Sequence, residues 1–182
     1  MSHDRHRASL RTALLSLAAV AAAVTGCTRP VTDHLVTGRP FPDITLTALD
    51  GSTRPLADYR GRLVVLNVWA TWCGPCRREL PSLQRLSKTL DPAQYAVIAM
   101  SVDDDATQVR EYLLDSGISL PAFIDRGRRI ANGVFGVHGF PDTFIIGPGG
   151  HLLGQIAGDR RWDAPAVTAA LEAARRGDHF DI

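Results

Sequence analysis

The sequence is poor in cysteine, in lysine and in net charge. It holds three cysteines and one lysine, Lys88, in 182 residues, and its formal net charge is +1. So few cysteines exclude a small scaffold built on disulfides. The near-zero charge argues against a nucleic-acid partner bound by phosphate neutralisation. A single lysine makes a lysine nucleophile a poor candidate.

The rest of the composition suits a packed domain. Hydrophobic residues make up 45% of the chain and charged residues 21%, which excludes disorder of the whole chain. The length fits one domain, or one domain with an appendage. The odd number of cysteines indicates that one of them has a role that prevents it from pairing.

The first 26 residues have the pattern of a targeting segment. Three arginines precede an apolar run over residues 13–24, which is short for a bilayer span and suits the core of a secretory signal. The run ends in Val24-Thr25-Gly26-Cys27, which resembles the lipobox of bacterial lipoproteins. That resemblance implies a lipid on Cys27 and a protein anchored in the cell envelope, facing the periplasm or the cell exterior. A plain signal peptide or a short membrane anchor, with Cys27 incidental, is the alternative.

The remaining chain divides into three parts. Residues 27–40 lie in a stretch rich in proline, glycine and polar residues, and they are predicted to form a lipidated tether. Residues 41–177 carry the periodic apolar patterns of a domain, and residues 178–182 are expected to form a C-terminal tail.

Strands and helices alternate in the predicted domain. Strands are expected over residues 44–47, 63–69, 95–102, 120–124, 143–146 and 151–157. Helices are expected after Cys76 to residue 90, after Asp105, over residues 126–135, and from Asp163 to Gly177. The Asp50-Gly51 pair predicts a hairpin turn. We expect Asp103–Asp105 and Asp163 to cap helices; a cation site at the acidic run is a weaker alternative. The order of elements favours an α/β sheet covered on both faces.

The segment Trp72-Cys73-Gly74-Pro75-Cys76 connects a buried strand to a leucine-striped helix. Two cysteines three residues apart can close a small disulfide ring. Free N–H groups and the helix dipole at a helix start stabilise a thiolate, which is the species that attacks disulfides. Pro75 is tolerated in the first helical turn.

This segment, extended over Asn67–Pro81, resembles the active site of the thioredoxin superfamily, in its membrane-tethered TlpA/ResA-like branch. The resemblance implies a thioredoxin-like three-layer α/β/α fold with a mixed central sheet and an N-terminal β-hairpin extension. It also implies a cis peptide bond at Phe140-Pro141, opposite the cysteines, and a kinking proline within the helix at Pro81. Glu79 matches an acidic residue that this branch places near its cysteines.

One position departs from thioredoxins proper, in which a buried aspartate stands where this chain has Asn67. An amide cannot accept a proton from Cys76, so Glu79 becomes the candidate internal base. The alternative is that Glu79 is an exposed helix residue flanked by Arg77 and Arg78.

The resemblance implies a thiol-disulfide oxidoreductase. Cys73 would attack a client protein disulfide and Cys76 would resolve the intermediate, with no cofactor other than the Cys73–Cys76 disulfide. The residues expected to form the client-binding surface are Trp72, Gly74, Pro75, Phe140 and Pro141. The Gly-Pro pair favours a reductase, supplied with electrons by a membrane thiol-disulfide donor and serving cytochrome c or copper-centre assembly.

Three rival functions use the same residues. Cys73 and Cys76 could bind Cu(I) with His138, as in copper chaperones, whereas a structural zinc lacks a second ligand pair. Cys73 could be a peroxidatic thiol with Thr71 nearby. The fold could also serve as a non-enzymatic scaffold. Trp69 and Trp162 are expected to be packing residues, and the isolated histidines at positions 34, 151 and 179 are expected to be solvated.

Overall fold

The computed structural model of the protein describes residues 35–182. The predicted leader, the lipidation site Cys27 and His34 therefore lie outside the described residues. Within residues 35–182, no helix combines the length and the apolar character needed to cross a membrane.

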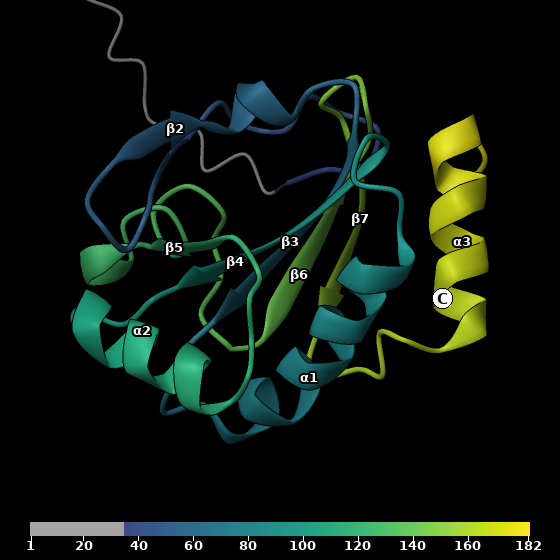
Figure 1. Cartoon of the computed structure of the whole chain (residues 1–182). Coiled ribbons are helices and arrows are strands. Elements are labelled where there is room, and N and C mark those ends of the chain that lie inside the picture. The colour runs from purple at the N-terminus through teal and green to yellow at the C-terminus, as the bar shows by residue number, and fades with distance from the viewer. Residues whose placement is uncertain (1–34) are drawn as a thin grey trace, which may run out of the picture. The chain divides into compact units, whose positions relative to one another are not determined.

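A five-stranded mixed sheet forms the centre of the domain, in the order β5-β4-β3-β6-β7 (Figure 1). The strands are β3 (Leu63–Trp69), β4 (Tyr95–Ser101), β5 (Ala122–Ile124), β6 (Asp142–Ile146) and β7 (Leu152–Ala157). β3 pairs in parallel with β4 and antiparallel with β6. Every residue of β3 and β4 is buried, which explains why both read as continuous apolar runs. The thioredoxin-like α/β fold is confirmed.

A separate two-stranded antiparallel sheet precedes the central one. It consists of β1 (Thr45–Thr47) and β2 (Thr53–Pro55), and the short helix η1 (Leu56–Tyr59) follows it. The Asp50 carboxylate accepts the N–H of Ser52 at 2.9 Å, and Gly51 adopts a positive φ of 87°. The predicted turn is thus confirmed.

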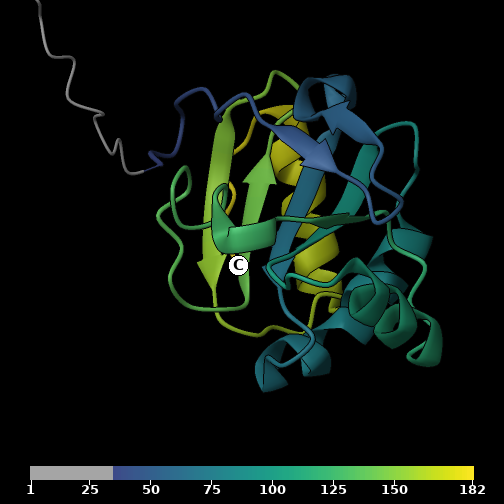
Figure 2. The same cartoon turned by 90° about the vertical axis from the view of Figure 1, so that its left-hand side faces the viewer.

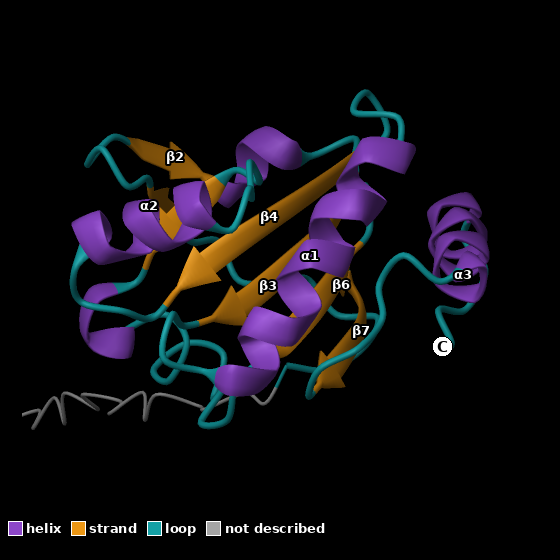
Figure 3. Ribbon diagram, turned by 60° about the horizontal axis from the view of Figure 1, so that its bottom comes forward, coloured by secondary structure: helices purple, strands orange, loops and turns teal. Residues whose placement is uncertain are grey.

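The α-helices α1 (Gly74–Thr89), α2 (Ala106–Asp115) and α3 (Pro165–Arg176) complete the domain. Figure 3 shows α1 and α2 lying across the sheet. The ring of Tyr112 in α2 packs against that of Trp69 in β3, with centroids 5.5 Å apart. Asn67, two residues earlier on the same strand, binds Glu79 of α1. Because residues two apart on a strand point to the same face, α1 and α2 cover one face together.

The opposite face is covered by loops and the hairpin, as Figure 2 shows. Thr143 points toward α1 through its contact with Asn67, so its neighbour Phe144 points the other way. The Phe144 ring meets Phe135 at 4.9 Å and Phe41 at 5.5 Å between centroids. The segment that contains Phe135 therefore packs where a third layer was expected.

That segment is not the regular helix predicted over residues 126–135. Only η2 (Arg126–Arg128) is helical, and turns follow it. Gly127 and Arg128 have positive φ values of 69° and 55°, which an α-helix does not tolerate. The buried Asp125 carboxylate accepts the N–H groups of Ile130 and Ala131 instead.

Helix caps were predicted correctly at one acidic site and wrongly at another. Asp105 is the N-cap of α2 and accepts the N–H of Thr107 at 2.8 Å. α3 begins after Ala164 with no side-chain cap, because the Asp163 carboxylate binds Arg85 Nε at 2.7 Å. Gly177 ends α3 as expected, with a φ of 102°.

Both ends of the described chain pack against β7. The Gly38 N–H donates to the Leu152 carbonyl at 2.7 Å, and the Leu152 N–H donates to the Arg39 carbonyl at 2.9 Å. Phe180, in the expected tail, is only 7% exposed and covers Gly154. The last residues of the expected tether and part of the expected tail thus belong to the packed domain.

Candidate active site

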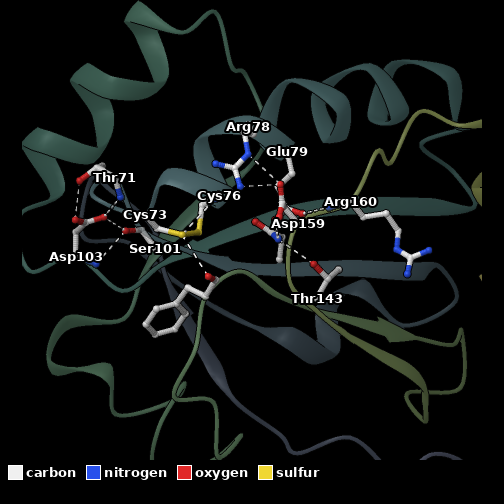
Figure 4. Close-up of a disulfide and its surroundings, with 12 residues drawn as sticks. Thr71, Cys73, Cys76, Arg78, Glu79, Ser101, Asp103, Thr143, Asp159 and Arg160 are labelled. Atoms are coloured by element: carbon white, nitrogen blue, oxygen red, sulfur yellow. Dashed lines mark hydrogen bonds and ion pairs between the residues drawn. A yellow bond between two sulfur atoms is a disulfide. The ribbon is translucent and has the colours of Figure 1, made fainter.

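The two cysteines of the CGPC segment form a disulfide where β3 is followed by α1 (Figure 4). Their Cα atoms are 5.3 Å apart. Cys73 is the N-cap of α1, and its sulfur accepts the N–H of Cys76 at 3.2 Å. Gly74 and Pro75 occupy the first turn of α1. Backbone N–H groups in the first turn have no carbonyl partner within the helix, so the missing N–H of proline costs no hydrogen bond. The helix start thus presents an N–H to the Cys73 sulfur, which stabilises a thiolate there.

The two cysteines differ in exposure. Cys73 is 6% exposed and Cys76 is fully buried. An incoming disulfide can therefore reach only the Cys73 sulfur directly, while Cys76 can reach only what is already bonded to Cys73.

A loop ahead of β6 faces the Cys73 sulfur. Its Phe140–Pro141 peptide bond is cis, as the family resemblance implied. The Phe140 carbonyl oxygen lies 3.4 Å from Cys73 Sγ. The backbone of residues 140–141 therefore lies beside the sulfur at which exchange with a client would occur.

Three side chains form an exposed surface beside Cys73, which we call the aromatic rim: Trp72, Phe140 and Arg128. Trp72 is 56% exposed and meets the Phe140 ring edge-on, with centroids 5.9 Å apart. The Arg128 guanidinium lies 5.3 Å from the Trp72 ring centroid and 5.9 Å from that of Phe140. Trp72 and Phe140 were predicted, whereas Arg128 was missed because its position depends on the left-handed backbone of η2.

Glu79 is buried, with 2% of its surface exposed, so the alternative of an exposed helix residue is wrong. Its Oε1 accepts a hydrogen bond from Asn67 Nδ2 at 2.7 Å. Its Oε2 accepts from Trp162 Nε1 at 2.9 Å and from the Arg160 N–H at 3.2 Å. Glu79 follows Cys76 by one helical turn, which places both side chains on the same face of α1.

Burial raises the pKa of Glu79 to about 7, and the hydrogen bonds from Trp162, Asn67 and Arg160 oppose that increase. A carboxyl group that titrates near neutrality can both take and give a proton at physiological pH. The geometry therefore suits the role of internal base that the sequence assigned to this residue.

Trp162 does more than the packing role expected from the sequence. It is fully buried, but its indole N–H is used by Glu79. Trp69, also fully buried, has an indole N–H without a hydrogen-bond partner in the structure. Because 83 residues separate Trp162 from Glu79, no local sequence signal could have indicated their contact.

Asp103 is buried and organises the segment just before Cys73. Its carboxylate accepts from the Thr71 N–H at 2.9 Å, from the Thr71 hydroxyl at 2.8 Å and from the Ser101 hydroxyl at 2.5 Å. The Thr71 hydroxyl is thus directed to Asp103. This contact gives no support to a peroxidatic role for Cys73 that depends on Thr71.

Asp142, which follows the cis proline, is another buried carboxyl group. Its Oδ2 accepts a hydrogen bond from Gln155 at 2.8 Å, and its Oδ1 has no partner. Burial raises the pKa of Asp142 to about 6. Nothing in the sequence pattern distinguished this residue from an ordinary strand residue.

The described residues hold no group of three metal-binding side chains. Within them, His138 Nδ1 lies 3.4 Å from the Asn132 amide nitrogen, and the two candidate thiol ligands are joined in the disulfide. The copper-binding alternative therefore gains no support from the geometry. His151 and His179 are exposed.

A thioredoxin-like sheet, a disulfide at the start of a helix and a cis-proline loop define a thiol-disulfide oxidoreductase. The comparisons with known proteins agree. Residues 37–154 match the AhpC/TSA family, and the chain belongs to that family.

Its relatives include thiol-disulfide oxidoreductases named ResA. The protein from Geobacillus kaustophilus is 33% identical over 156 residues, covering 85% of this chain and 89% of the relative. The protein from Bacillus anthracis is 32% identical over 123 residues, covering 68% and 70%.

Two solved structures share the fold. A thiol:disulfide interchange protein from Chlorobium tepidum has a TM-score of 0.62 and 29% identity, and the match covers 73% of this chain and 96% of the other. A DsbF homologue from Corynebacterium diphtheriae has a TM-score of 0.64 and 27% identity, with 72% and 86% covered. The chain is thus a thiol-disulfide oxidoreductase whose redox pair is Cys73–Cys76.

Proposed function

We propose that this oxidoreductase works as a reductase of protein disulfides outside the cytoplasm. The observation that carries the proposal is the pairing of an accessible N-cap sulfur, Cys73, with a fully buried one, Cys76, one turn ahead of the buried Glu79. This arrangement separates the attacking sulfur from the resolving sulfur and places a base beside the latter.

In the first step, the Cys73 thiolate of the reduced protein attacks one sulfur of the client disulfide. A bond forms between Cys73 and that sulfur, the client S–S bond breaks, and the other client sulfur leaves as a thiolate. The helix N-terminus stabilises the attacking thiolate. The aromatic rim and the Phe140 carbonyl, which lies 3.4 Å from Cys73 Sγ, hold the client segment.

In the second step, Glu79 takes the proton of the Cys76 thiol. The Cys76 thiolate then attacks Cys73 Sγ, the bond from Cys73 to the client breaks, and the client sulfur leaves as a second thiolate. The client has gained two electrons, and the protein is left with the disulfide seen in the structure.

The reducing direction rests on the Gly74-Pro75 pair, which resembles the reducing members of the superfamily. In an oxidising envelope the protein would need a membrane thiol-disulfide donor to return it to the dithiol. Attachment through a lipid on Cys27 keeps it near such a donor. Clients whose cysteines must be reduced before they bind haem or copper, in cytochrome c or copper-centre assembly, are the proposed substrates.

Two cysteine variants test the order of attack. Cys76→Ser should accumulate a mixed disulfide between Cys73 and a model protein client, visible as an added mass that reductant removes. Cys73→Ser should form none and should lose client reduction. Persistent reduction by Cys73→Ser would overturn the mechanism.

The redox potential tests the direction. Equilibration with glutathione or dithiothreitol, followed by alkylation and mass measurement, should give a value near that of thioredoxin, about −270 mV. A value near that of strong oxidants, about −120 mV, would make the protein an oxidase.

Lipid attachment is tested on the full chain expressed in a bacterial host. The mature protein should sediment with membranes and carry the mass of an acylated N-terminal cysteine, and Cys27→Ser should release it from them. A mature mass without lipid would contradict the proposed anchor.

A further inference from the structure

The loop between β7 and α3, residues 158–163, runs beside α1 and reaches the Glu79 carboxylate. It supplies both donors to Glu79 Oε2, the Trp162 indole at 2.9 Å and the Arg160 N–H at 3.2 Å. Figure 4 shows Arg160 on the side of Glu79 away from the disulfide. This loop, rather than α1 itself, therefore sets the surroundings of one carboxylate oxygen.

Three side chains of α1 besides Glu79, namely Arg78, Ser82 and Arg85, hold the loop in place. Arg78 binds Asp159, with Nε to Oδ2 at 3.1 Å, and Arg85 binds Asp163 at 2.7 Å. The Ser82 hydroxyl accepts the Trp162 N–H at 3.0 Å. Trp162 is thus fixed at its backbone as well as at its indole, and the ring has no exposed surface.

We propose that Trp162 is a positioning residue for thiol-disulfide exchange: its indole N–H holds Oε2 of Glu79 so that Oε1 remains the oxygen that receives the proton of Cys76. The inference rests on the proposed role of Glu79 as the base for Cys76. It adds a residue that touches neither sulfur nor client.

The hydrogen-bond count explains how this works. An ionised carboxylate has about four acceptor positions, and Glu79 uses three of them, two on Oε2 and one on Oε1. The free position is therefore on Oε1. Losing the indole donor would leave a second acceptor position of the carboxylate unoccupied, this one on Oε2. It would also favour the protonated form of the carboxyl group, because that donor stabilises the anion.

Other groups act on the same carboxylate and must stay constant in the test. The charge of Asp159 raises the pKa of Glu79, and Arg78 pairs with Asp159. Arg160 lies on the loop, and Asn67 on β3 is neutral. Cys76 precedes Glu79 on α1. A variant that leaves these groups unchanged isolates the indole.

Trp162→Phe is such a variant, and Trp69→Phe is its matched control. Both positions are fully buried tryptophans, but only the Trp162 indole N–H has a partner. Reduced protein is mixed with 5,5′-dithiobis(2-nitrobenzoate), which releases one coloured thiolate when Cys73 attacks and a second when Cys76 resolves. The rate of the second phase is measured against pH.

We expect the second phase to accelerate through the pKa of Glu79. The midpoint should move to higher pH by about one unit in Trp162→Phe, the size expected for one hydrogen bond to a charged group. The first phase should be unchanged in both variants, and the midpoint should be unchanged in Trp69→Phe. Equal midpoints in the two variants would overturn the positioning role.

A measurement on the unaltered protein covers the case in which Trp162→Phe does not fold. In the oxidised protein, the indole ¹H–¹⁵N resonance of Trp162 should titrate with the midpoint of the Glu79 carboxyl ¹³C signal, whereas that of Trp69 should not. An indole resonance of Trp162 that ignores this titration would also overturn the inference. A different result would show that Glu79 is not the base for Cys76, as the proposed function requires. In that case Glu79→Gln would leave the pH profile of the second phase unchanged.

Discussion

The Asn67 amide nitrogen lies 2.7 Å from Glu79 Oε1 and 2.9 Å from Thr143 Oγ1. Both of its protons are therefore used as donors, one toward α1 and one toward β6. Asn67 cannot accept a proton from Cys76 in this position, and its amide instead donates a hydrogen bond to the Glu79 carboxylate. The amide and the buried glutamate form one hydrogen-bonded unit, in which the ionisable group is on the helix rather than on the strand.

Asn67→Asp should therefore be destabilising in a pH-dependent way. Two carboxyl groups within hydrogen-bond distance in a buried site must share a proton, which raises the pKa of the pair. We expect a loss in the free energy of unfolding of about 2 kcal/mol at pH 8 and a smaller loss at pH 5, where the shared proton is bound. Urea unfolding at both values measures this. Asn132→Asp serves as the control. An equal loss of stability at both pH values in Asn67→Asp would contradict the prediction.

Glu79 itself should make the oxidised protein less stable as the pH rises. Its pKa in the folded protein is about 7, against an ordinary value of 4.5, so the folded state binds the proton more tightly between these values. The resulting stabilisation is complete below about pH 4.5 and is lost as the pH rises to about 7, and it amounts to on the order of 3 kcal/mol. Glu79→Gln should remove this part of the pH dependence. A wild-type slope in the variant between pH 5 and 7 would refute it.

Asp142→Asn should increase stability at neutral pH. The carboxyl group is buried, one of its oxygens lacks a partner, and its pKa is raised to about 6. Since the folded state favours the neutral form, the neutral amide should gain about 1–2 kcal/mol over aspartate at pH 8 and little at pH 4. Chemical unfolding at the two pH values tests this. A gain of the same size at pH 4 would mean that charge is not its cause.

Arg128→Gln should lower the efficiency of client reduction without affecting the fold. Arg128 is exposed, so the change in unfolding free energy should not exceed the energy of its contact with the Trp72 ring, about 1 kcal/mol at most. Loss of its contact with the Trp72 ring, worth about 0.5–1 kcal/mol at an exposed site, should reduce kcat/KM for a protein disulfide several-fold. Arg129→Gln, at the exposed neighbouring position, is the control. Identical kcat/KM values for the two variants would exclude a role for Arg128 at the aromatic rim.

Gly154→Ala should displace the C-terminal residues from the sheet. A Cβ at this position would lie 2.6 Å from Cδ1 of Phe180, closer than van der Waals contact allows. The substitution should cost about 1–3 kcal/mol in the wild-type background and much less in a Phe180→Ala background. A double-mutant cycle measures the coupling. Additive effects would show that Phe180 does not pack on Gly154 in solution.

The elements that follow local rules were predictable from the sequence. β3 is a seven-residue strand that is apolar apart from Asn67, and α1 carries leucines at helical spacing. Both formed where their patterns indicated. The redox pair and the cis Phe140–Pro141 bond followed from the family resemblance. The Asp105 cap followed from short-range chemistry alone.

The features that depend on distant partners were not predictable. Asp163 would have capped α3, but Arg85, 78 residues away, binds its carboxylate. The helix expected over residues 126–135 is replaced because Asp125 and the left-handed residues Gly127 and Arg128 favour a different backbone. The burial of Glu79 depends on Trp162, whose indole could be placed only by the tertiary structure.

The pairing of Gly38 and Arg39 with Leu152 fixes the point at which the chain enters the domain. Leu152 lies at the start of β7, opposite Ile146, whereas the disulfide follows the other end of β3, where Val68 pairs with Asp142. The four residue steps between Asp142 and Ile146 separate these two levels by about 13 Å. The entry point of the chain and the redox pair therefore occupy opposite ends of one sheet.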